Sequence, residues 1–490
     1  MSSYFLTLLV AIPLAGAVLT LFLPKTQESA IKAVAAVASF IPVLLVVAMW
    51  AQYNPSAGMQ FVEKYQWIPS FNVQYYLGVD GMSFPLGVLT AIVSFLAVIA
   101  SFSIHNRIKE YMVLILLLEV GMLGVFAALD YVLFYVFWEL VLLPMYFLIG
   151  IWGGARREYA AIKFFIYTLI GSVIMLVGIL ALYFGTGKET FDILAIAQKA
   201  PKMIDPGVQK WIFLALFFGF AVKVPVFPFH TWLPDAHVEA PTPISMILAG
   251  VLLKMGTYAM IRISHPTLPD AAKWFAYALM VLGMLNIVYG ALAAMAQKDF
   301  KKMVAYSSVN HMGYFLLGLA AGTPAALNGA LFVMISHGLI SALFFFCVGM
   351  FYERTHTREF AKLGGMFLTV PVIATVTAVT AFANLGLPGM SGFIGEFFVF
   401  LGAYPVFKYL VVIAGAGLVV TAAMHLIMMR KVLQGNPMEE WKGLPDITGR
   451  EWFIAVPLIA LIVYLGIYPA PLINVFNPAV VALSKMIGGI

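Results

Sequence analysis

Residues 220–245 read FAVKVPVFPFHTWLPDAHVEAPTPIS and combine one lysine, two histidines and five prolines. The chain around this stretch is very apolar, since 63% of its 490 residues are hydrophobic and only 10% are charged. An ordinary soluble domain has about 25% charged residues. Apolar runs of about 20 residues recur along the chain, and each can cross a hydrocarbon core of roughly 30 Å as a helix. The sequence therefore predicts an all-α integral membrane protein in which 220–245 interrupts one span.

The apolar runs predict about 14 transmembrane helices. The first run is expected to remain as a spanning helix, because no Lys or Arg precedes it as in a signal peptide. The longer connections, 51–79, 185–210 and 430–451, carry Pro, Gly and charges and are expected to be structured surface loops. The expected spans lie near 4–23, 30–50, 80–104, 111–129, 131–152, 161–184, 211–233, 243–264, 272–296, 302–321, 326–351, 368–402, 408–429 and 452–475.

The basic residues predict the topology. With these spans, about 17 Lys and Arg fall on one side of the membrane and about 9 on the other. The positive-inside rule makes the basic side cytoplasmic and places both termini outside the cytoplasm. The formal charge of +6 therefore reports on topology. We expect the chain to lie in the lipid bilayer and not to bind nucleic acid.

Two spans, the seventh and the twelfth, contain helix-breaking residues. One carries Lys223-Val-Pro225-Val-Phe-Pro228 and the other Ala383-Asn-Leu-Gly386-Leu-Pro388-Gly-Met-Ser-Gly392. Proline removes a backbone donor, so carbonyl groups at membrane depth need other partners. Breaks five helices apart suggest an inverted repeat of helices 4–8 and 9–13, although ordinary proline kinks are the alternative. The repeat divides the chain into 1–110 (helices 1–3), 111–265 and 266–433 (the two repeats) and 434–490 (a loop and helix 14).

Several ionisable residues lie near the middle of predicted spans. A charge at the bilayer centre costs about 2.5–3.5 kcal/mol on insertion scales, so such residues usually face the bundle interior. Taken singly, each could be a structural ion pair or an interhelical hydrogen bond. Taken together, they predict a path for protons through both halves of the chain. The mid-span residues are Glu139, Lys223, Lys254, His311, His337, Glu396 and His425, with Glu119 and Asp130 as weaker candidates.

Lysine suits such a path because its proton affinity can be changed by its surroundings. Burial disfavours the charged ammonium group, whereas a nearby carboxylate favours it. A change in the separation of Glu139 and Lys223 could thus make the lysine hold or release a proton, and the broken helix beside it provides a hinge and freed carbonyls. The polar residues that follow, His230, Asp235, His237 and Glu239, are expected in a cytoplasmic loop as a possible proton entry. A metal site is the alternative, but they lack a recognisable ligand spacing.

At these residues the chain resembles a known family. HTWLPDAHVEAPTPIS (230–245), with Lys223 before it, Lys254 after it and FWELVLLPMYF (137–147) upstream, is similar to the antiporter-like membrane subunits of respiratory complex I and of related cation/proton antiporters and membrane-bound hydrogenases. Most siblings carry lysine at the position of Glu396, whereas the M-subunit branch, counterpart of mitochondrial subunit 4, carries glutamate. The resemblance implies a proton relay of Glu139 and Lys223, then Lys254, His311 and His337, and finally Glu396.

The same resemblance implies a bacterial inner-membrane complex, NADH:quinone oxidoreductase, with two sibling antiporter-like subunits among its membrane partners. This chain has no Gly-rich nucleotide motif and a single cysteine, Cys347, which cannot hold an iron–sulfur cluster. Flavin, iron–sulfur clusters and quinone are therefore expected in partner subunits, with no cofactor or metal here. The alternatives are a subunit of a multi-subunit cation/proton antiporter or ion-pumping hydrogenase, and a non-conducting membrane scaffold.

Overall fold

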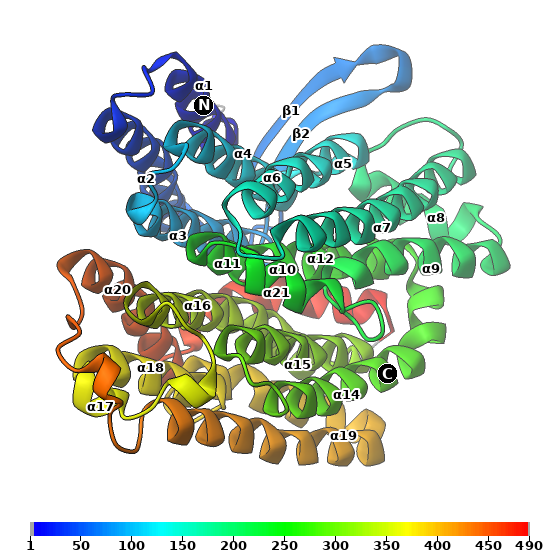
Figure 1. The fold of residues 1–490 in the computed structure, drawn as a ribbon. Coiled ribbons are helices and arrows are strands. Elements are labelled where there is room, and N and C mark those ends of the chain that lie inside the picture. Colours follow the sequence, from blue (N-terminus) through cyan, green and yellow to red (C-terminus); the bar gives the residue numbers. More distant parts are fainter. Residues whose placement is uncertain (1–3, 489–490) are drawn as a thin grey trace. The chain divides into compact units, whose positions relative to one another are not determined.

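The computed structural model describes residues 4–488 and is built almost entirely of helices (Figure 1). Among the described residues, 11 helices are long and apolar enough to cross a membrane. The prediction of an all-α membrane protein is confirmed. The expected total of about 14 spans and the inverted relation between helices 4–8 and 9–13 stay predictions.

The helices gather into two compact units. The first unit comprises Met1–Val224, Val251–Ala276 and Asn474–Ile490, and the second comprises Pro225–Gly250 and Tyr277–Ile473. The boundary at Val224 and Pro225 falls on the first predicted helix break. This division by packing differs from the division by repeats into 1–110, 111–265, 266–433 and 434–490, which remains untested.

The first unit is a bundle in which α7 packs along α9. Small residues allow this close approach, because a Cβ on Gly219 would lie 2.6 Å from the carbonyl oxygen of Gly171. Two π-helical turns, Leu248–Leu252 and Met260–Ser264, flank α12. The helices of this unit are α1 (Phe5–Phe22), α2 (Glu28–Gln52), α3 (Phe84–Ala100), α4 (Ile108–Ala127), α5 (Tyr131–Leu140), α6 (Leu142–Trp152), α7 (Arg157–Gly185), α8 (Ile193–Met203), α9 (Pro206–Lys223), α12 (Leu253–Ala259) and α13 (His265–Thr267).

An antiparallel hairpin occupies part of the connection expected as loop 51–79. Its strands are β1 (Gln60–Ile68) and β2 (Val73–Val79), and Asn72 makes the turn in the left-handed region with φ 51°. Asp130 joins this hairpin to α5, because its carboxylate accepts from the backbone N–H groups of Gln74 (3.0 Å) and Val132 (2.8 Å). Burial raises the pKa of the Asp130 carboxyl, and these N–H donors oppose the rise.

The second unit is organised around α16, and the most apolar stretch of this helix is entirely buried. Helices α15, α18, α19 and α20 pack against it. A helix buried on all sides is apolar all round, and the sequence ALFVMISHGLISALFFFCVG (330–349) fits that position. The helices are α10 (Trp232–Glu239), α11 (Thr242–Ile247), α15 (Phe300–Ala321), α16 (Pro324–Thr355), α17 (Met366–Thr369), α18 (Pro371–Asn384), α19 (Ser391–Val432) and α20 (Gly449–Ile467); α14 (Pro269–Met295) and α21 (Ala470–Met486) each belong partly to both units.

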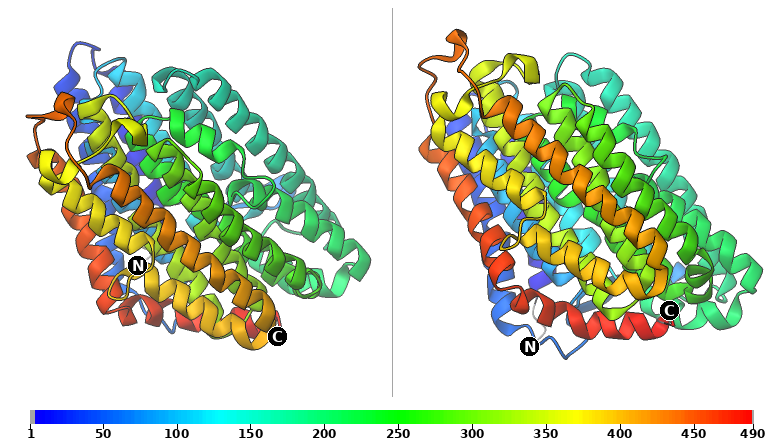
Figure 2. Two further views of the ribbon diagram at one scale, coloured as in Figure 1. Left: turned by 60° about the horizontal axis from the view of Figure 1, so that its bottom comes forward. Right: turned by 90° about the horizontal axis from the view of Figure 1, so that it is seen from below.

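Helix α19 consists of two limbs that fold back on each other. Its 42 residues are interrupted by non-helical torsion angles at Phe407, just after Pro405. The second limb, 408–432, returns beside α18, so that His425 reaches Asn384 and the backbone N–H of Gly365 donates to the carbonyl of Gln434. Figure 2 shows α18 in yellow, followed by the first limb in gold, with the second limb in orange running back alongside. The expected spans 368–402 and 408–429 correspond to these segments.

Three connections differ from the sequence-based expectation. The segment expected as a cytoplasmic loop with His230, Asp235, His237 and Glu239 contains the helix α10, in which Pro234 is accommodated within the first turn. The connection 185–210 contains α8, capped by Asp192. The last expected span, 452–475, is divided between α20 and a further helix, α21, which begins at Ala470; the apolar residues of α21 lie on one side, which a search for uniformly apolar runs does not detect.

Candidate functional site

Lys223 is the last residue of α9, where Pro225 prevents the helix from continuing. Its side chain is buried, with an exposed fraction of 2%. The ammonium nitrogen lies 5.3 Å from the ring centroid of Trp138 and 5.9 Å from that of Phe164. Aromatic faces attract a cation, so the two rings help to hold the ammonium group in place.

Glu139 follows Trp138 on α5 and is half-buried. Its Oε1 atom is enclosed and has no hydrogen-bond partner within the described part of the chain. The carboxylate is close enough to act electrostatically on Lys223. The structure thus brings together the two residues that the sequence pairs, without a tight ion pair to lock them.

Lys254 lies on α12 and is completely buried. Gly256, two residues after Lys254, lets α12 come very close to the end of α9. A Cβ on Gly256 would be 3.0 Å from the Cβ of Lys223 and 2.7 Å from a methyl carbon of Val224. Lys223 and Lys254 are therefore on adjoining helices in close contact. The flanking π-helical turns are local departures that often mark functional sites.

In the second unit His311, on α15, is held by two carbonyl groups. Its Nδ1 atom is 2.6 Å from the carbonyl oxygen of Ser307 and its Nε2 atom is 2.8 Å from that of Asn384. A carbonyl oxygen can only accept, so both ring nitrogens must donate for both bonds to form. The site is therefore shaped for the doubly protonated imidazolium. The Asn384 carbonyl is available because α18 ends there.

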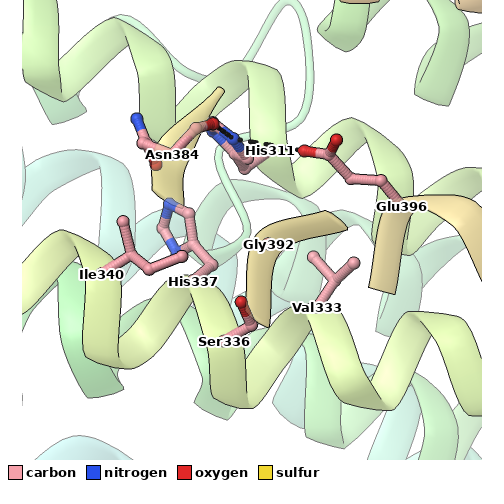
Figure 3. A pocket seen from close by; sticks show the side chains of 8 residues that line it. All are labelled: His311, Val333, Ser336, His337, Ile340, Asn384, Gly392 and Glu396. Carbon is pink, nitrogen blue, oxygen red and sulfur yellow. Dashed lines mark hydrogen bonds and ion pairs between the residues drawn. The ribbon is translucent and has the colours of Figure 1, made fainter. Parts of the chain in front are cut away.

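Glu396 lies beside His311. Its Oε1 atom lies 3.5 Å from His311 Nε2, and the side chains of both residues are buried. A cavity of about 10 Å³, room for about one water molecule, lies among the side chains of His311, Ser336, His337 and Glu396 (Figure 3). The ring of His337, on α16, is 5.3 Å from that of His311. Three of the residues expected from the sequence thus form one cluster around a water-sized space.

The four residues expected as a proton entry are spread around α10. His230 precedes the helix, and its Nε2 lies 3.1 Å from the hydroxyl of Tyr289. His237 is buried and stacks on Phe345 with the ring centroids 4.3 Å apart, whereas Asp235 and Glu239 are half-buried. On α10, Asp235 and Glu239 are four residues apart and share a face, whereas His237 lies on another. In the described residues no group of three or more His, Cys, Asp or Glu side chains is arranged to hold a metal ion.

Sequence reasoning missed Asn286, whose side chain hydrogen-bonds to backbone groups at the first helix break. Asn286, on α14, accepts from the N–H of Phe227 (2.8 Å) and donates to the carbonyls of Pro225 (3.2 Å) and Val309 (3.3 Å). A lone amide within the apolar run ALMVLGMLNIVYG (278–290) was the available signal. A buried ion pair between Asp80 and Arg262 was also missed; Arg262 donates to the hydroxyl of Tyr258 at 3.3 Å as well.

A bundle of spanning helices with buried carboxylates, lysines and histidines in both compact units defines an ion-translocating membrane subunit. The chain belongs to the NADH:quinone oxidoreductase/Mrp antiporter family of membrane subunits, because the model of that family matches residues 128–422. The model of the amino terminus of NADH-ubiquinone oxidoreductase chain 4 matches residues 7–124. The chain is thus of the subunit M, or chain 4, type within proton-translocating NADH:quinone oxidoreductases.

Individual relatives agree with this assignment. NADH-quinone oxidoreductase subunit M of Rhodobacter capsulatus is 44% identical over 92% of this chain and 89% of its own length. NAD(P)H-quinone oxidoreductase chain 4 of a Nostoc species is 41% identical over 98% and 91%. A chain of respiratory complex I from Thermus thermophilus superposes with a TM-score of 0.90 at 30% identity, covering all of both chains. A chain of the Mrp complex from a Dietzia species shares the fold, with a TM-score of 0.87 at 21% identity over 100% of this chain and 99% of its own.

Proposed function

We propose that this chain moves protons through its buried side chains and that redox chemistry in other subunits drives the movement. The relay consists of Glu139, Lys223 and Lys254 in the first unit and of His311, His337 and Glu396 in the second. The observation that carries the proposal is the cluster of His311 and Glu396 beside a water-sized cavity.

The His311–Glu396 pair can pass a proton without leaving a net charge behind. As an imidazolium and a carboxylate the pair is neutral overall, and it is neutral again after the Nε2 proton has moved to Glu396. An isolated buried charge would cost several kcal/mol, so this exchange within the pair is much cheaper than charging one residue alone. One water in the cavity would contact the side chains of His311, His337 and Glu396 and bring His337 into the same exchange.

The first unit supports the same chemistry with a different pair. Lys223 is buried against aromatic rings, and Glu139 acts on it across a distance that the helix break allows to change. Lys254 is the next proton acceptor, on the helix that Gly256 brings against α9. Of the residues near α10, His230 and Asp235 are proposed to take up protons, together with His237 and Glu239.

The wider setting is part of the proposal. The chain works in a bacterial inner membrane with both termini outside the cytoplasm. Flavin, iron–sulfur clusters and quinone are bound by partner subunits, and two sibling antiporter-like subunits are among its membrane neighbours. The identity of 41–44% to proteins named subunit M or chain 4 favours this setting over a separate cation/proton antiporter or hydrogenase.

The test replaces Lys223 by arginine in the complete complex. Guanidinium keeps the positive charge and the contact with Trp138 but does not release its proton. Lys223→Arg, Lys223→Ala and Glu139→Gln should each assemble, as seen on native gels, yet lose NADH-driven proton uptake in membrane vesicles together with the coupled quinone reduction.

Lys210→Arg is the matched control. Lys210 is on the same helix, and its ammonium lies 5.1 Å from the ring centroid of Trp274, nearly the geometry of Lys223 on Trp138. This control should assemble and pump normally. Full pumping by an assembled Lys223→Arg complex would assign the buried charges to a scaffold role instead.

A further inference from the structure

His425 is a buried histidine that the relay described above does not use. It lies on the second limb of α19, has an exposed fraction of 0%, and stacks on Phe344. Its Nδ1 atom is 2.7 Å from the carbonyl oxygen of Thr421, four residues earlier on the same helix. Because that carbonyl can only accept, Nδ1 carries a hydrogen.

The other ring nitrogen of His425 faces the side chain of Asn384. The amide nitrogen of Asn384 is 2.8 Å from His425 Nε2 and 3.3 Å from the hydroxyl oxygen of Ser307. That hydroxyl donates to the carbonyl of Val304 at 2.7 Å, so it must accept from Asn384. This fixes the orientation of the amide: its NH₂ group points to His425, the Nε2 of which is therefore an unprotonated acceptor.

The same asparagine binds His311 through its backbone. Both histidines donate Nδ1–H to the carbonyl four residues earlier, Ser307 for His311 and Thr421 for His425, and both turn Nε2 toward Asn384. His311 meets a carbonyl oxygen, which requires a proton on Nε2. His425 meets an NH₂ group, which requires that Nε2 has none. Asn384 therefore holds two similar histidines in opposite protonation states.

We propose that His425 is a further proton-carrying residue of the second unit and that Asn384 is the positioning residue that controls its exchange with His311. This inference rests on the proposed function. When His311 gives its Nε2 proton to Glu396, the Asn384 carbonyl loses its donor. A turn of the amide then presents Oδ1 to His425, which takes up a proton on Nε2 as an imidazolium. Glu396, the last residue of the relay, releases its proton to water, and transfer of the His425 proton to His311 Nε2 then restores the first state, with one proton moved.

The position of His425 indicates the side from which the proton comes. It lies seven residues before Val432, at the end of α19 that carries Arg430 and Lys431. On α15, which begins at the same end with Phe300, the residue level with His425 is Ser307, also seven residues from the helix end, and His311 lies one turn further in. His425 is thus nearer than His311 to the basic end of these helices and supplies protons from that end.

The test compares His425→Gln and Asn384→Leu with His265→Gln in the assembled complex. His265 is also buried and its Nδ1 also donates to a backbone carbonyl, that of Met260 at 2.9 Å, but it lies in the first unit on α13. We expect both test variants to slow NADH-driven proton uptake by about a hundredfold, the lower end of the range for losing a proton-transfer group. Their solvent deuterium isotope effect should rise, and the control should match the unaltered complex.

The double variant adds a second criterion. Because the two residues act in series, His425→Gln with Asn384→Leu should be no slower than the slower single variant. If Asn384→Leu does not assemble, Asn384→Asp decides, because it keeps the shape but presents only acceptors to His425 and should also slow uptake.

Two results separate this inference from the proposed function. Uptake and isotope effect in His425→Gln equal to those of His265→Gln, while His311→Gln is impaired, would overturn the role of His425 and leave the relay intact. Full uptake by His311→Gln as well would overturn the relay itself.

Discussion

Gly256→Ala tests whether the close contact between α9 and α12 determines the rate of proton transfer, and it alters no charge. The added Cβ would lie 2.7 Å from a methyl carbon of Val224, 3.0 Å from the Cβ of Lys223 and 3.0 Å from the carbonyl oxygen of Phe220. Carbon atoms normally pack about 3.5–4.0 Å apart, so the helices must separate by roughly 0.5–1 Å. Such overpacking costs about 1–3 kcal/mol, partly offset by the gain of about 1 kcal/mol in helix propensity.

The complex should therefore assemble while the lysines move apart. A displacement of about 1 Å in a reacting group can cost about a hundredfold in rate, so we expect proton uptake to fall by roughly 10- to 100-fold. The assay is NADH-driven proton uptake in vesicles, normalised to complex on native gels. Gly87→Ala on α3 is the control, because a Cβ there meets no atom within 4 Å. Unchanged uptake in an assembled Gly256→Ala complex would refute the reasoning.

The remaining predictions concern pairs and turns seen only in the structure. Asp80→Asn should lower thermal stability of the complex by the equivalent of ~3–5 kcal/mol, because it leaves the Arg262 guanidinium buried without its counter-charge, and adding Arg262→Met should restore most of the loss. Gly386→Ala should impair proton uptake, because φ is +81° and the new Cβ would lie 2.5 Å from Oε2 of Glu396, displacing that carboxylate from His311. Asp130→Ala should destabilise by ~0.5–2 kcal/mol in thermal unfolding, since α5 loses its N-cap.

The sequence alone determined the membrane class and the residues worth considering. Long apolar runs can only be spanning helices, because unpaired backbone groups are too costly in lipid. The same cost makes each mid-span Lys, Glu or His stand out, which is why the sequence already singles out Lys223, Lys254 and Glu396 as candidates. Proline and glycine mark the breaks because they act locally on the backbone.

Only the tertiary structure shows how these residues are arranged. The contact between α9 and α12 depends on the packing of Gly256 against Val224, two residues that are 32 positions apart in the sequence. His311 has two carbonyl partners, and one of them belongs to Asn384, which is 73 residues away. His425 looks like any other mid-span histidine in the sequence, and only the structure places it 2.8 Å from the side-chain amide of Asn384. Hydrogen bonds and close packing between distant segments are set by the path of the backbone, so no local pattern of residues encodes them.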